Sequence, residues 1–424
     1  MANISGVIIN GTVYKFNGGG SDSGTKVISG NSFADLCFVD ENGKVVFEVG
    51  DGHLKSANFD SRNAAPTSIA NSVLFNDISP WCPSSVDSGY SNPTSGWGRD
   101  TKRADWSATD KYTYYEFLEH YYDTYLGVSN NYRVSKRGLW DDGANDGHEV
   151  FEYDFCPINY KYTIMLSAGM NADETQGIWG LATFIRCLMA EEEPMLAIAK
   201  ANIRFKVIPI INASGFDEAT LRYNYSNGVN PNFNFNFKDS WANQTSSAKG
   251  SYPDSNPETV ALKRWVNEHS GKALLWLDLH TGRWVVEGNT NKTIMDIRFG
   301  NENAYFADFN TYHAPLIKQY YVNLGTISSS DTVGGATSVR NNVDYIKHKY
   351  AVDICGINSA MPEMHLESTG YGADGYTNNT PEGIKCYVMQ VRQIMMYAVN
   401  KHATGQPTEA LPLLGDVLNN FKKI

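Results

Sequence analysis

The stretch that decides the fold is LLWLDLHTG, residues 274–282, in which an apolar run leads directly to Asp278 and His280. A short apolar run of this kind predicts a strand that is buried on both faces. KYTIMLSAG (161–169) and IRFKVIPII (203–211) are similar runs, and the helical patterns IWGLATFIRCLM (178–189) and ETVALKRWVNEH (258–269) lie between the three. Strands that alternate with helices predict an α/β fold with a mixed, mostly parallel sheet covered by helices on both faces.

Two further helices are expected around this sheet. Apolar residues recur on one face of the segment 107–126, and Thr109 or Asp110 can cap a helix there. A long closing helix is expected over 380–401, with Thr380 as its N-cap and Pro381 in its first turn.

Polar side chains gather where the predicted strands end. Ligand sites in sheets of this type lie at the carboxyl ends of the strands. Three segments supply polar groups there: Asn171, Asp173 and Glu174 after the first strand, Asp278 and His280 at the end of another, and Glu363 and Glu367 in PEMHLESTG (362–370). The sequence therefore predicts a functional site at this edge of the sheet.

These pieces, in their order and spacing, resemble the zinc carboxypeptidase family over roughly residues 107–402. The matching segments are GMNADE (169–174), RYN (222–224), GVNPNFNF (228–235), LDLHTG (277–282) and PEMHLESTG (362–370). The resemblance implies a carboxypeptidase-like domain whose metal holds one position open for water. It implies these roles: Glu174 and His280 as Zn²⁺ ligands, Arg222 on the oxyanion, Asn232 positioning substrate, Glu363 as general base with Glu367 as its alternative, and Tyr371 or Tyr376 covering the substrate.

Two positions depart from the family pattern. Asn171 stands where the first ligand histidine is expected, and an amide oxygen is a poorer zinc donor than an imidazole. The metal is therefore zinc at reduced affinity, a harder divalent ion, or none, in which case Asn171 is a helix cap. Phe233 stands where an arginine would grip a terminal carboxylate, so a cell-wall peptide, internal amide or ester is a better substrate candidate.

The first 62 residues are expected to form a small β module. Short apolar runs are separated by the turn sequences Glu41-Asn42-Gly43 and Gly50-Asp51-Gly52. The wording VDENGKVVFEVGDGHLKSANFDS (39–61) resembles N-terminal modules of phage tail-associated proteins. The expected organisation is a β attachment or oligomerisation module (1–62), an irregular linker or lid (63–106), a carboxypeptidase-like domain (107–403) and a tail (404–424).

Composition narrows the partners. A net charge of −11 argues against nucleic acid or an anionic membrane surface, and no apolar stretch is long enough to span a membrane. Six cysteines without a C-x-x-C pair are interpreted as free thiols. No signal peptide is visible, and abundant Tyr, Asn, Gly and Ser suit a virion or extracellular protein.

Two functions follow from these observations. The first is a virion-associated metallopeptidase-like hydrolase that acts on bacterial surface peptide or peptidoglycan and joins other virion proteins, as a homo-oligomer, through the N-terminal module. The second is a catalytically inactive carboxypeptidase-like tail protein that binds a surface glycan or peptide without cleaving it.

Overall fold

The computed structural model describes residues 4–9, 12–15, 35–40, 45–50, 53–56, 59–60, 81, 83, 113–129, 131–141, 148–172, 174–218, 229–281, 293–299, 309, 332–334, 346–364 and 381–404. Two separate sheets lie within these residues, one in the first 60 residues and one in the remainder.

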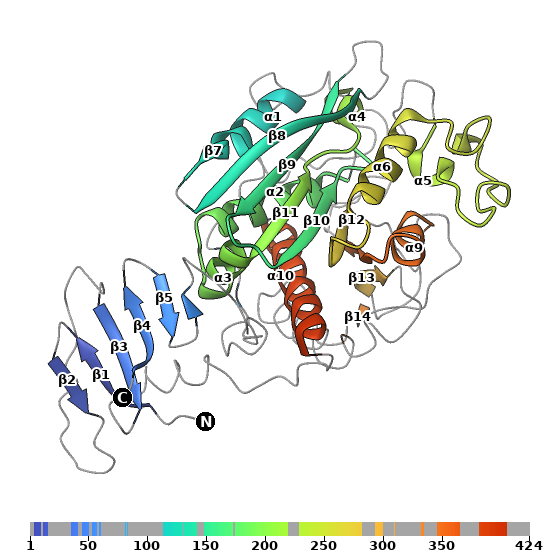
Figure 1. Ribbon diagram of the computed structural model, residues 1–424. Coiled ribbons are helices and arrows are strands. Elements are labelled where there is room, and N and C mark those ends of the chain that lie inside the picture. The colour runs from blue at the N-terminus through green and yellow to red at the C-terminus, as the bar shows by residue number, and fades with distance from the viewer. Residues whose placement is uncertain are drawn as a thin grey trace.

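The larger sheet has nine strands in the order β14-β13-β15-β12-β10-β11-β9-β8-β7. Its strands are β7 (Gly127–Val128), β8 (Tyr132–Asp141), β9 (Glu149–Pro157), β10 (Tyr162–Ala168), β11 (Ile203–Ile208), β12 (Leu275–Thr281), β13 (Thr293–Phe299), β14 (Thr332–Gly334) and β15 (Asn358–Met364). The three apolar runs of the sequence are β10, β11 and β12, and they lie at the centre (Figure 1).

The expected mixed α/β fold is confirmed, with parallel pairs at the centre of the sheet and one more between the edge strands β13 and β14. β10 pairs in parallel with β11 and β12, and β12 with β15. The outer strands β7, β8 and β9 join through antiparallel pairs, and β13 pairs with β15 in the same way. Strand β8 is not among the strands expected from the sequence. Its apolar residues are interrupted by charged ones, as where Arg133 separates the buried residues Tyr132 and Val134.

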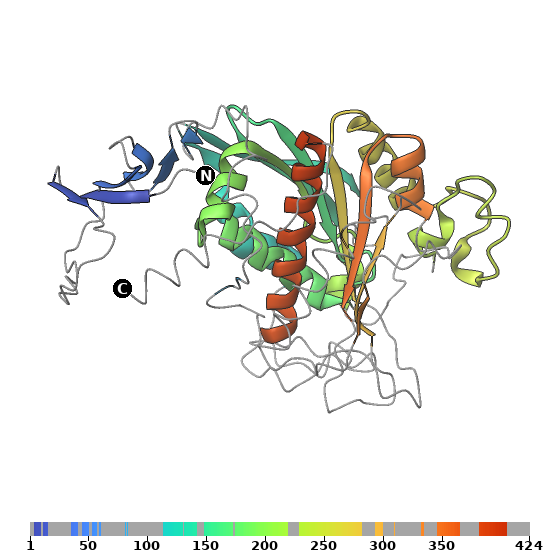
Figure 2. The same ribbon diagram turned by 90° about the horizontal axis from the view of Figure 1, so that it is seen from below.

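Helices cover both faces of this sheet (Figure 2). One face carries α2 (Thr175–Met189), α3 (Pro194–Asn202) and α10 (Pro381–Thr404), and the other carries α6 (Pro257–Glu268) and α9 (Ile346–Asp353). Strand alternation explains the division, because Trp276 contacts Trp265 of α6 whereas Leu279 lies against Gly177 of α2. Shorter helical segments are α1 (Tyr114–Tyr121), η3 (Asp123–Tyr125), α4 (Ala213–Glu218), α5 (Pro231–Asn234) and η4 (Ser247–Lys249).

The starts of two helices test the predicted caps. α1 begins at Tyr114, and its cap is Thr113, whose side chain forms a capping box with Glu116. The prediction of Thr109 or Asp110 as the cap is therefore wrong. α10 begins at Pro381 as expected, while Thr380 lies outside the described residues.

The N-terminal sheet is antiparallel throughout, in the order β2-β1-β3-β4-β5-β6. Its strands are β1 (Ile4–Ile9), β2 (Thr12–Lys15), β3 (Asp35–Asp40), β4 (Val45–Gly50), β5 (His53–Ser56) and β6 (Phe59–Asp60). The two predicted turn sequences fall between β3 and β4 and between β4 and β5, so the expected strands are present.

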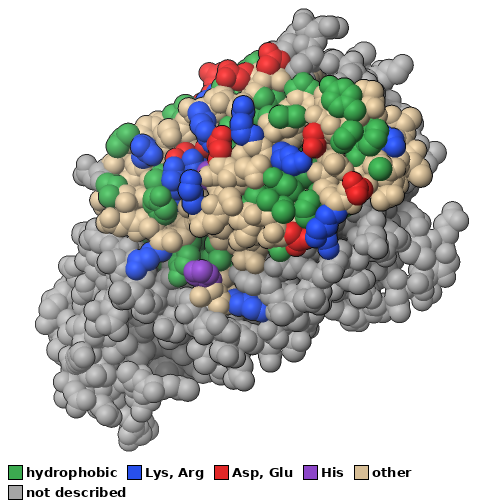
Figure 3. All heavy atoms as spheres, turned by 45° about the vertical axis from the view of Figure 1, so that its right-hand side comes forward, with side chains coloured by type: hydrophobic (Ala, Val, Ile, Leu, Met, Phe, Trp, Pro, Cys, Tyr) green, Lys and Arg blue, Asp and Glu red, His purple; other side chains and the backbone are tan. Residues whose placement is uncertain are grey.

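The described surface mixes both signs of charge with apolar side chains (Figure 3). No helix among the described residues is long and apolar enough to cross a membrane. Among the six cysteines, Cys156, Cys187 and Cys355 are free thiols in the structure.

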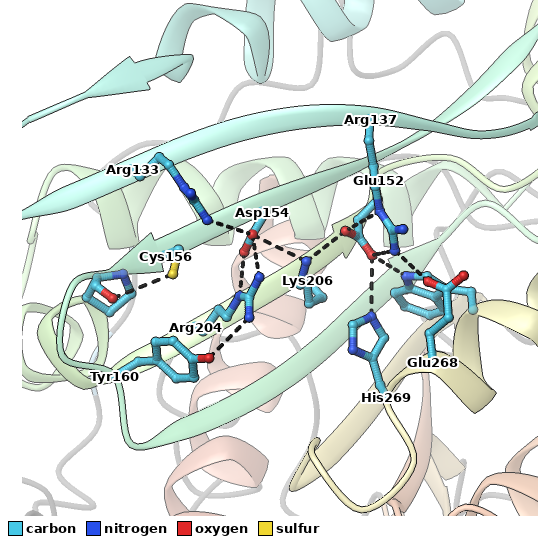
Figure 4. Close-up of polar contacts among 12 residues, drawn as sticks. Arg133, Arg137, Glu152, Asp154, Cys156, Tyr160, Arg204, Lys206, Glu268 and His269 are labelled. Atoms are coloured by element: carbon cyan, nitrogen blue, oxygen red, sulfur yellow. Dashed lines mark hydrogen bonds and ion pairs between the residues drawn. The ribbon is translucent and has the colours of Figure 1, made fainter.

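An ionic cluster lies on β8, β9 and β11 (Figure 4). Glu152 contacts Arg137 and Lys206, and Asp154 contacts Arg204 and Lys206. Both carboxylates are buried, whereas the Arg137 side chain is 46% exposed. The cluster ties the antiparallel edge of the sheet to the parallel centre.

Candidate active site at the carboxyl ends of β10 and β12

Gly169 turns the chain out of β10 toward the candidate site. Its φ of +67° lies in the left-handed region that side chains disfavour, and the Ile178 and Ile210 side chains leave little room for a Cβ there. The next residues return toward the sheet, with the Glu174 amide donating to the Asn171 carbonyl at 3.0 Å. Asn171 and Glu174 are thereby placed at the carboxyl end of the parallel strands.

Gly177 then sets the position of α2. A Cβ on this residue would lie 2.9 Å from the Leu279 carbonyl oxygen, so only glycine lets the helix approach β12 so closely. This approach brings Glu174, the residue before α2, beside His280 at the end of β12. On the same face of the sheet, the Tyr387 hydroxyl of α10 donates to the His280 carbonyl and fixes the end of the strand.

Three of the predicted metal ligands meet here. His280 Nδ1 lies 2.8 Å from Glu174 Oε2, and Asn171 Nδ2 donates to Glu174 Oε1 at 2.7 Å. All three side chains are buried, with exposed fractions of 5% or less. Asn171 does not cap α2, because Glu174 occupies the N-cap position, so the interpretation of Asn171 as a helix cap is wrong.

The other ring nitrogen of His280 faces a second carboxylate. His280 Nε2 lies 2.9 Å from Asp278 Oδ2, while the Ser167 hydroxyl donates to Asp278 Oδ1 at 2.7 Å. The Lys347 ammonium lies 2.5 Å from Asp278 Oδ2 and 3.2 Å from His280 Nε2. His348 Nε2 is 4.0 Å from the same carboxylate oxygen.

Burial and these charges shift the pKa values in opposite directions. Burial raises the pKa of Asp278, but the positive charges of Lys347 and His280 lower it by more. The net pKa therefore lies well below its usual range. Burial and Lys347 lower the pKa of His280, but Asp278 and Glu174 raise it to about 9. Burial and Lys347 hold the pKa of His348 well below its usual range. The described side chains alone thus favour a charged Asp278 and a protonated His280.

The donor set for a metal ion is unusual. Within the described ranges, no group of three or more His, Cys, Asp and Glu residues is arranged to hold a metal ion. Two such residues, Glu174 and His280, do meet, and Asn171 adds an amide. Asn171 Oδ1 is buried and accepts no hydrogen bond from the described atoms. This oxygen, beside Glu174, is therefore available as a metal ligand.

The remaining predicted site residues are placed only in part. Glu363 of β15 pairs in register with His280, and its side chain is outside the described set, as is that of Asn232 on α5. Phe233 is half-buried on α5, and its amide donates to the Asn230 carbonyl at 3.0 Å. Asp173 also lies outside the described residues, together with Arg222, Glu367, Tyr371 and Tyr376.

Three residues of the site were not singled out in the sequence. Ser167 is a polar residue inside a buried strand, and that conflict with its apolar neighbours is a signal that could have found it. Lys347 and His348 lie in the first turn of α9, in a segment without a clear apolar face, and no local pattern marks them.

One family model matches part of the chain. Residues 158–328 match the family model for zinc carboxypeptidase, a range that contains Asn171, Glu174 and His280. No curated protein matches the sequence at a significant level.

Two solved structures illustrate the likeness. A metallo-carboxypeptidase from Burkholderia cenocepacia is 13% identical, with a TM-score of 0.47 and coverage of 69% of this chain and 70% of that chain. The carboxypeptidase A from Helicoverpa armigera is 16% identical, with a TM-score of 0.45 and coverage of 68% of this chain and 74% of that chain. In its segment 158–328, which supplies both strands of the site, the chain is therefore similar to the zinc carboxypeptidases.

Proposed function

We propose that the chain is a metallopeptidase-like hydrolase that acts on bacterial surface peptide or peptidoglycan. The observation that carries this proposal is the convergence of Glu174, His280 and Asn171, in which Nδ1 of His280 lies 2.8 Å from Glu174 Oε2. These side chains come from two different strand ends and are buried together. Burial of charged groups is unfavourable unless they are paired with other groups.

The residues fit a divalent cation of a particular kind. Glu174 offers a carboxylate, His280 offers Nδ1, and rotation of the Asn171 amide would present the oxygen that now has no partner. One imidazole and two oxygen donors suit zinc less well than an ion that prefers oxygen, such as Mn²⁺. When bound, the cation supplies Lewis-acid activation of water and of the scissile carbonyl.

The chain's own residues prepare this site. With a cation bound, His280 would be neutral, with its Nε2 proton donated to Asp278 and its Nδ1 free to face the cation. Glu363 is the proposed general base, supported by its register position opposite His280 on β15, and Glu367 is its alternative. Arg222 is proposed to stabilise the oxyanion and Asn232 to position the substrate, with Tyr371 covering it.

Phe233 narrows the substrate class. A phenyl ring cannot make the bidentate contact that an arginine makes to a terminal carboxylate. A peptide whose carboxyl terminus is blocked or distant, as in cross-linked cell-wall peptide, is therefore favoured over a free polypeptide end.

The N-terminal sheet is proposed as an attachment module of a phage tail. Its small size and its edge strands β2 and β6 suit association with another virion protein or a homo-oligomer, because isolated small sheets are marginal. The proposed units are the module (1–62), linker (63–106), hydrolase-like domain (107–403) and tail (404–424). A virion location is proposed on the basis of this module and the composition.

One observation favours a second function. The Lys347 ammonium already neutralises Asp278, and Asn171 occupies one oxygen of Glu174. A site that balances its charges with protein groups can persist without a cation. The second candidate is therefore a catalytically inactive tail protein that uses the same sheet edge to bind a surface peptide or glycan.

Metal content separates the two functions. Protein purified without chelator is compared with His280→Ala by elemental mass spectrometry, and His402→Ala, an exposed histidine on α10, is the control. The hydrolase proposal predicts a near-stoichiometric divalent metal in the wild type and in His402→Ala, with loss in His280→Ala. Asn171→His should shift the preference toward zinc and tighten its binding by roughly tenfold or more.

Activity completes the test. The same proteins are incubated with purified peptidoglycan and with peptides, and new amines are quantified. Release that requires the metal and His280 supports the hydrolase. Absence of metal in the wild type, with none taken up from added Mn²⁺ or Zn²⁺, would refute it and leave the binding function to be tested with whole cells.

A further inference from the structure

Lys347 is a buried cation at the candidate site that was not predicted from the sequence. It belongs to the first turn of α9, and only 1% of its surface is exposed. A lysine is rarely buried to this degree unless an anion pairs with it, since loss of hydration is costly. The anion here is Asp278, whose Oδ2 lies 2.5 Å from the Lys347 Nζ.

The same oxygen also receives the imidazole of His280. Nε2 of His280 lies 2.9 Å from Asp278 Oδ2, and the Lys347 Nζ is 3.2 Å from that ring nitrogen. Two donors therefore share one carboxylate oxygen, while the Ser167 hydroxyl holds the other at 2.7 Å. The consequence is that Asp278 gives His280 a weaker acceptor than an unshared carboxylate would.

Lys347 also places a full positive charge against the ring that would ligate the cation. A cation at Nδ1 would lie on the other side of the same imidazole. In a buried site, where the effective dielectric constant is far below that of water, like charges separated by one ring repel each other strongly.

We infer that Lys347 is a positioning residue that lowers the affinity of this site for divalent cations, because it takes part of Asp278 from His280 and opposes a second cation. The inference rests on the proposed function, since it concerns the cation held by Asn171, Glu174 and His280. Lys347 and the cation are competing ways to neutralise the two carboxylates Glu174 and Asp278. The site therefore binds a cation less tightly than the same donors would without Lys347.

The test measures cation affinity and not activity. Isothermal titration with MnCl₂ and with ZnCl₂ is carried out on the wild type, Lys347→Met and Lys347→Arg. Removal of the charge should tighten binding by about tenfold or more, whereas arginine, which keeps the charge, should leave affinity close to that of the wild type. Lys238→Met is the control, because Lys238 is an exposed lysine whose partner Asp353 is also on α9.

A double-variant cycle covers the case in which Lys347→Met does not fold. Asp278→Asn alone should weaken cation binding by about tenfold or more, because His280 loses its carboxylate partner. Adding Lys347→Met to Asp278→Asn removes the opposing charge and leaves no unpaired ion, so binding should recover by a similar factor. A purely structural lysine would give no recovery.

The outcomes separate the two claims. If the wild type binds Mn²⁺ and Lys347→Met binds no more tightly, or the double variant shows no recovery, the inference is wrong while the proposed function stands. If only Lys347→Met binds, the inference is supported, because the charge alone then excludes the cation, while the proposed hydrolase function fails for the wild type. If neither protein binds a cation, the proposed function fails and the inference fails with it.

Discussion

Glu152 is the residue whose removal should test the stability of the domain most directly (Figure 4). Its side chain has no exposed surface, and its oxygens lie 2.9 and 3.0 Å from Arg137 nitrogens and 2.9 Å from Lys206 Nζ. The indole of Trp265 donates to it at 2.5 Å, and His269 lies 3.5 Å away. Substitution by glutamine keeps the volume but removes the charge.

The expected cost is large because the partners stay buried. Lys206 is only 6% exposed and would lose one of its two carboxylates, since Asp154 at 3.3 Å would remain. Breaking a buried pair from one side costs about 3–5 kcal/mol. For a domain of this size, that loss lowers the melting temperature by roughly 5–10 °C.

The cost should also depend on pH. Burial alone raises the pKa of Glu152, but His269, Arg137 and Lys206 together lower it, so the net value lies well below the ordinary 4.5. A carboxyl with a depressed folded-state pKa stabilises the protein above its unfolded pKa, and this contribution is lost as the pH falls toward the folded value. The difference between Glu152→Gln and the wild type should therefore shrink below about pH 4.5.

The control is Glu268→Gln. Glu268 contacts the same guanidinium at 2.8 Å, but its side chain is 38% exposed, so its loss should cost about 1 kcal/mol or less. Urea unfolding followed by circular dichroism gives both values at neutral and acidic pH. Equal costs for the two variants, or a Glu152→Gln cost that does not fall with pH, would refute the reasoning.

Three other substitutions or reactions probe the same domain. Asn234→Ala should lose about 2–4 kcal/mol in urea unfolding, because the buried amide bridges the Lys249 and Tyr252 carbonyls and accepts from the Asn256 amide, whereas the exposed Asn243→Ala should change little. Gly177→Ala should lose about 1–3 kcal/mol despite the helix preference of alanine, since the Cβ would meet the Leu279 carbonyl; a stability gain in the same assay would contradict the packing described. Burial raises the pKa of Cys187 to about 12. At about pH 8 its thiol should therefore react with a disulfide reagent at least about a hundredfold more slowly in the folded protein than in the denatured protein. The variant Cys187→Ser identifies which part of the signal comes from this thiol.

The central strands of the sheet could be predicted from the sequence, because the apolar runs that form them are visible within each segment. A strand buried on both faces is mainly apolar, and β10, β11 and β12 have such runs, interrupted by Arg204 and Lys206 in β11 and by the polar residues of the site. The antiparallel edge is different. Strand β8 alternates in burial and carries Arg137, whose partners lie on β9 and α6, so its pattern resembles that of an exposed segment until the ion pairs are known.

The candidate site could be predicted only where the ligands follow strand ends. Glu174 and His280 stand at such positions, and the family pattern connects them. Lys347 could not be found in this way, because 67 residues separate it from His280 and its role depends on α9 packing against β15. The register of β12 with β15, which places Glu363 opposite His280, is likewise a long-range property.

A comparison of the two buried carboxylate centres explains why one is assigned a structural role and the other a function. Around Glu152, Arg137, Lys206 and Trp265 direct their donors at both oxygens, and no further ion is needed to balance the charge. Around Glu174 the protein supplies a histidine and an amide, and the oxygen of that amide, on Asn171, is buried without a described partner. A buried acceptor left unpaired costs stability, and such a cost persists in a folded protein when another requirement maintains it. The unused oxygen of Asn171, next to the pairing of Glu174 with His280, therefore distinguishes the end of β10 from the Glu152 centre and supports the proposed binding site there.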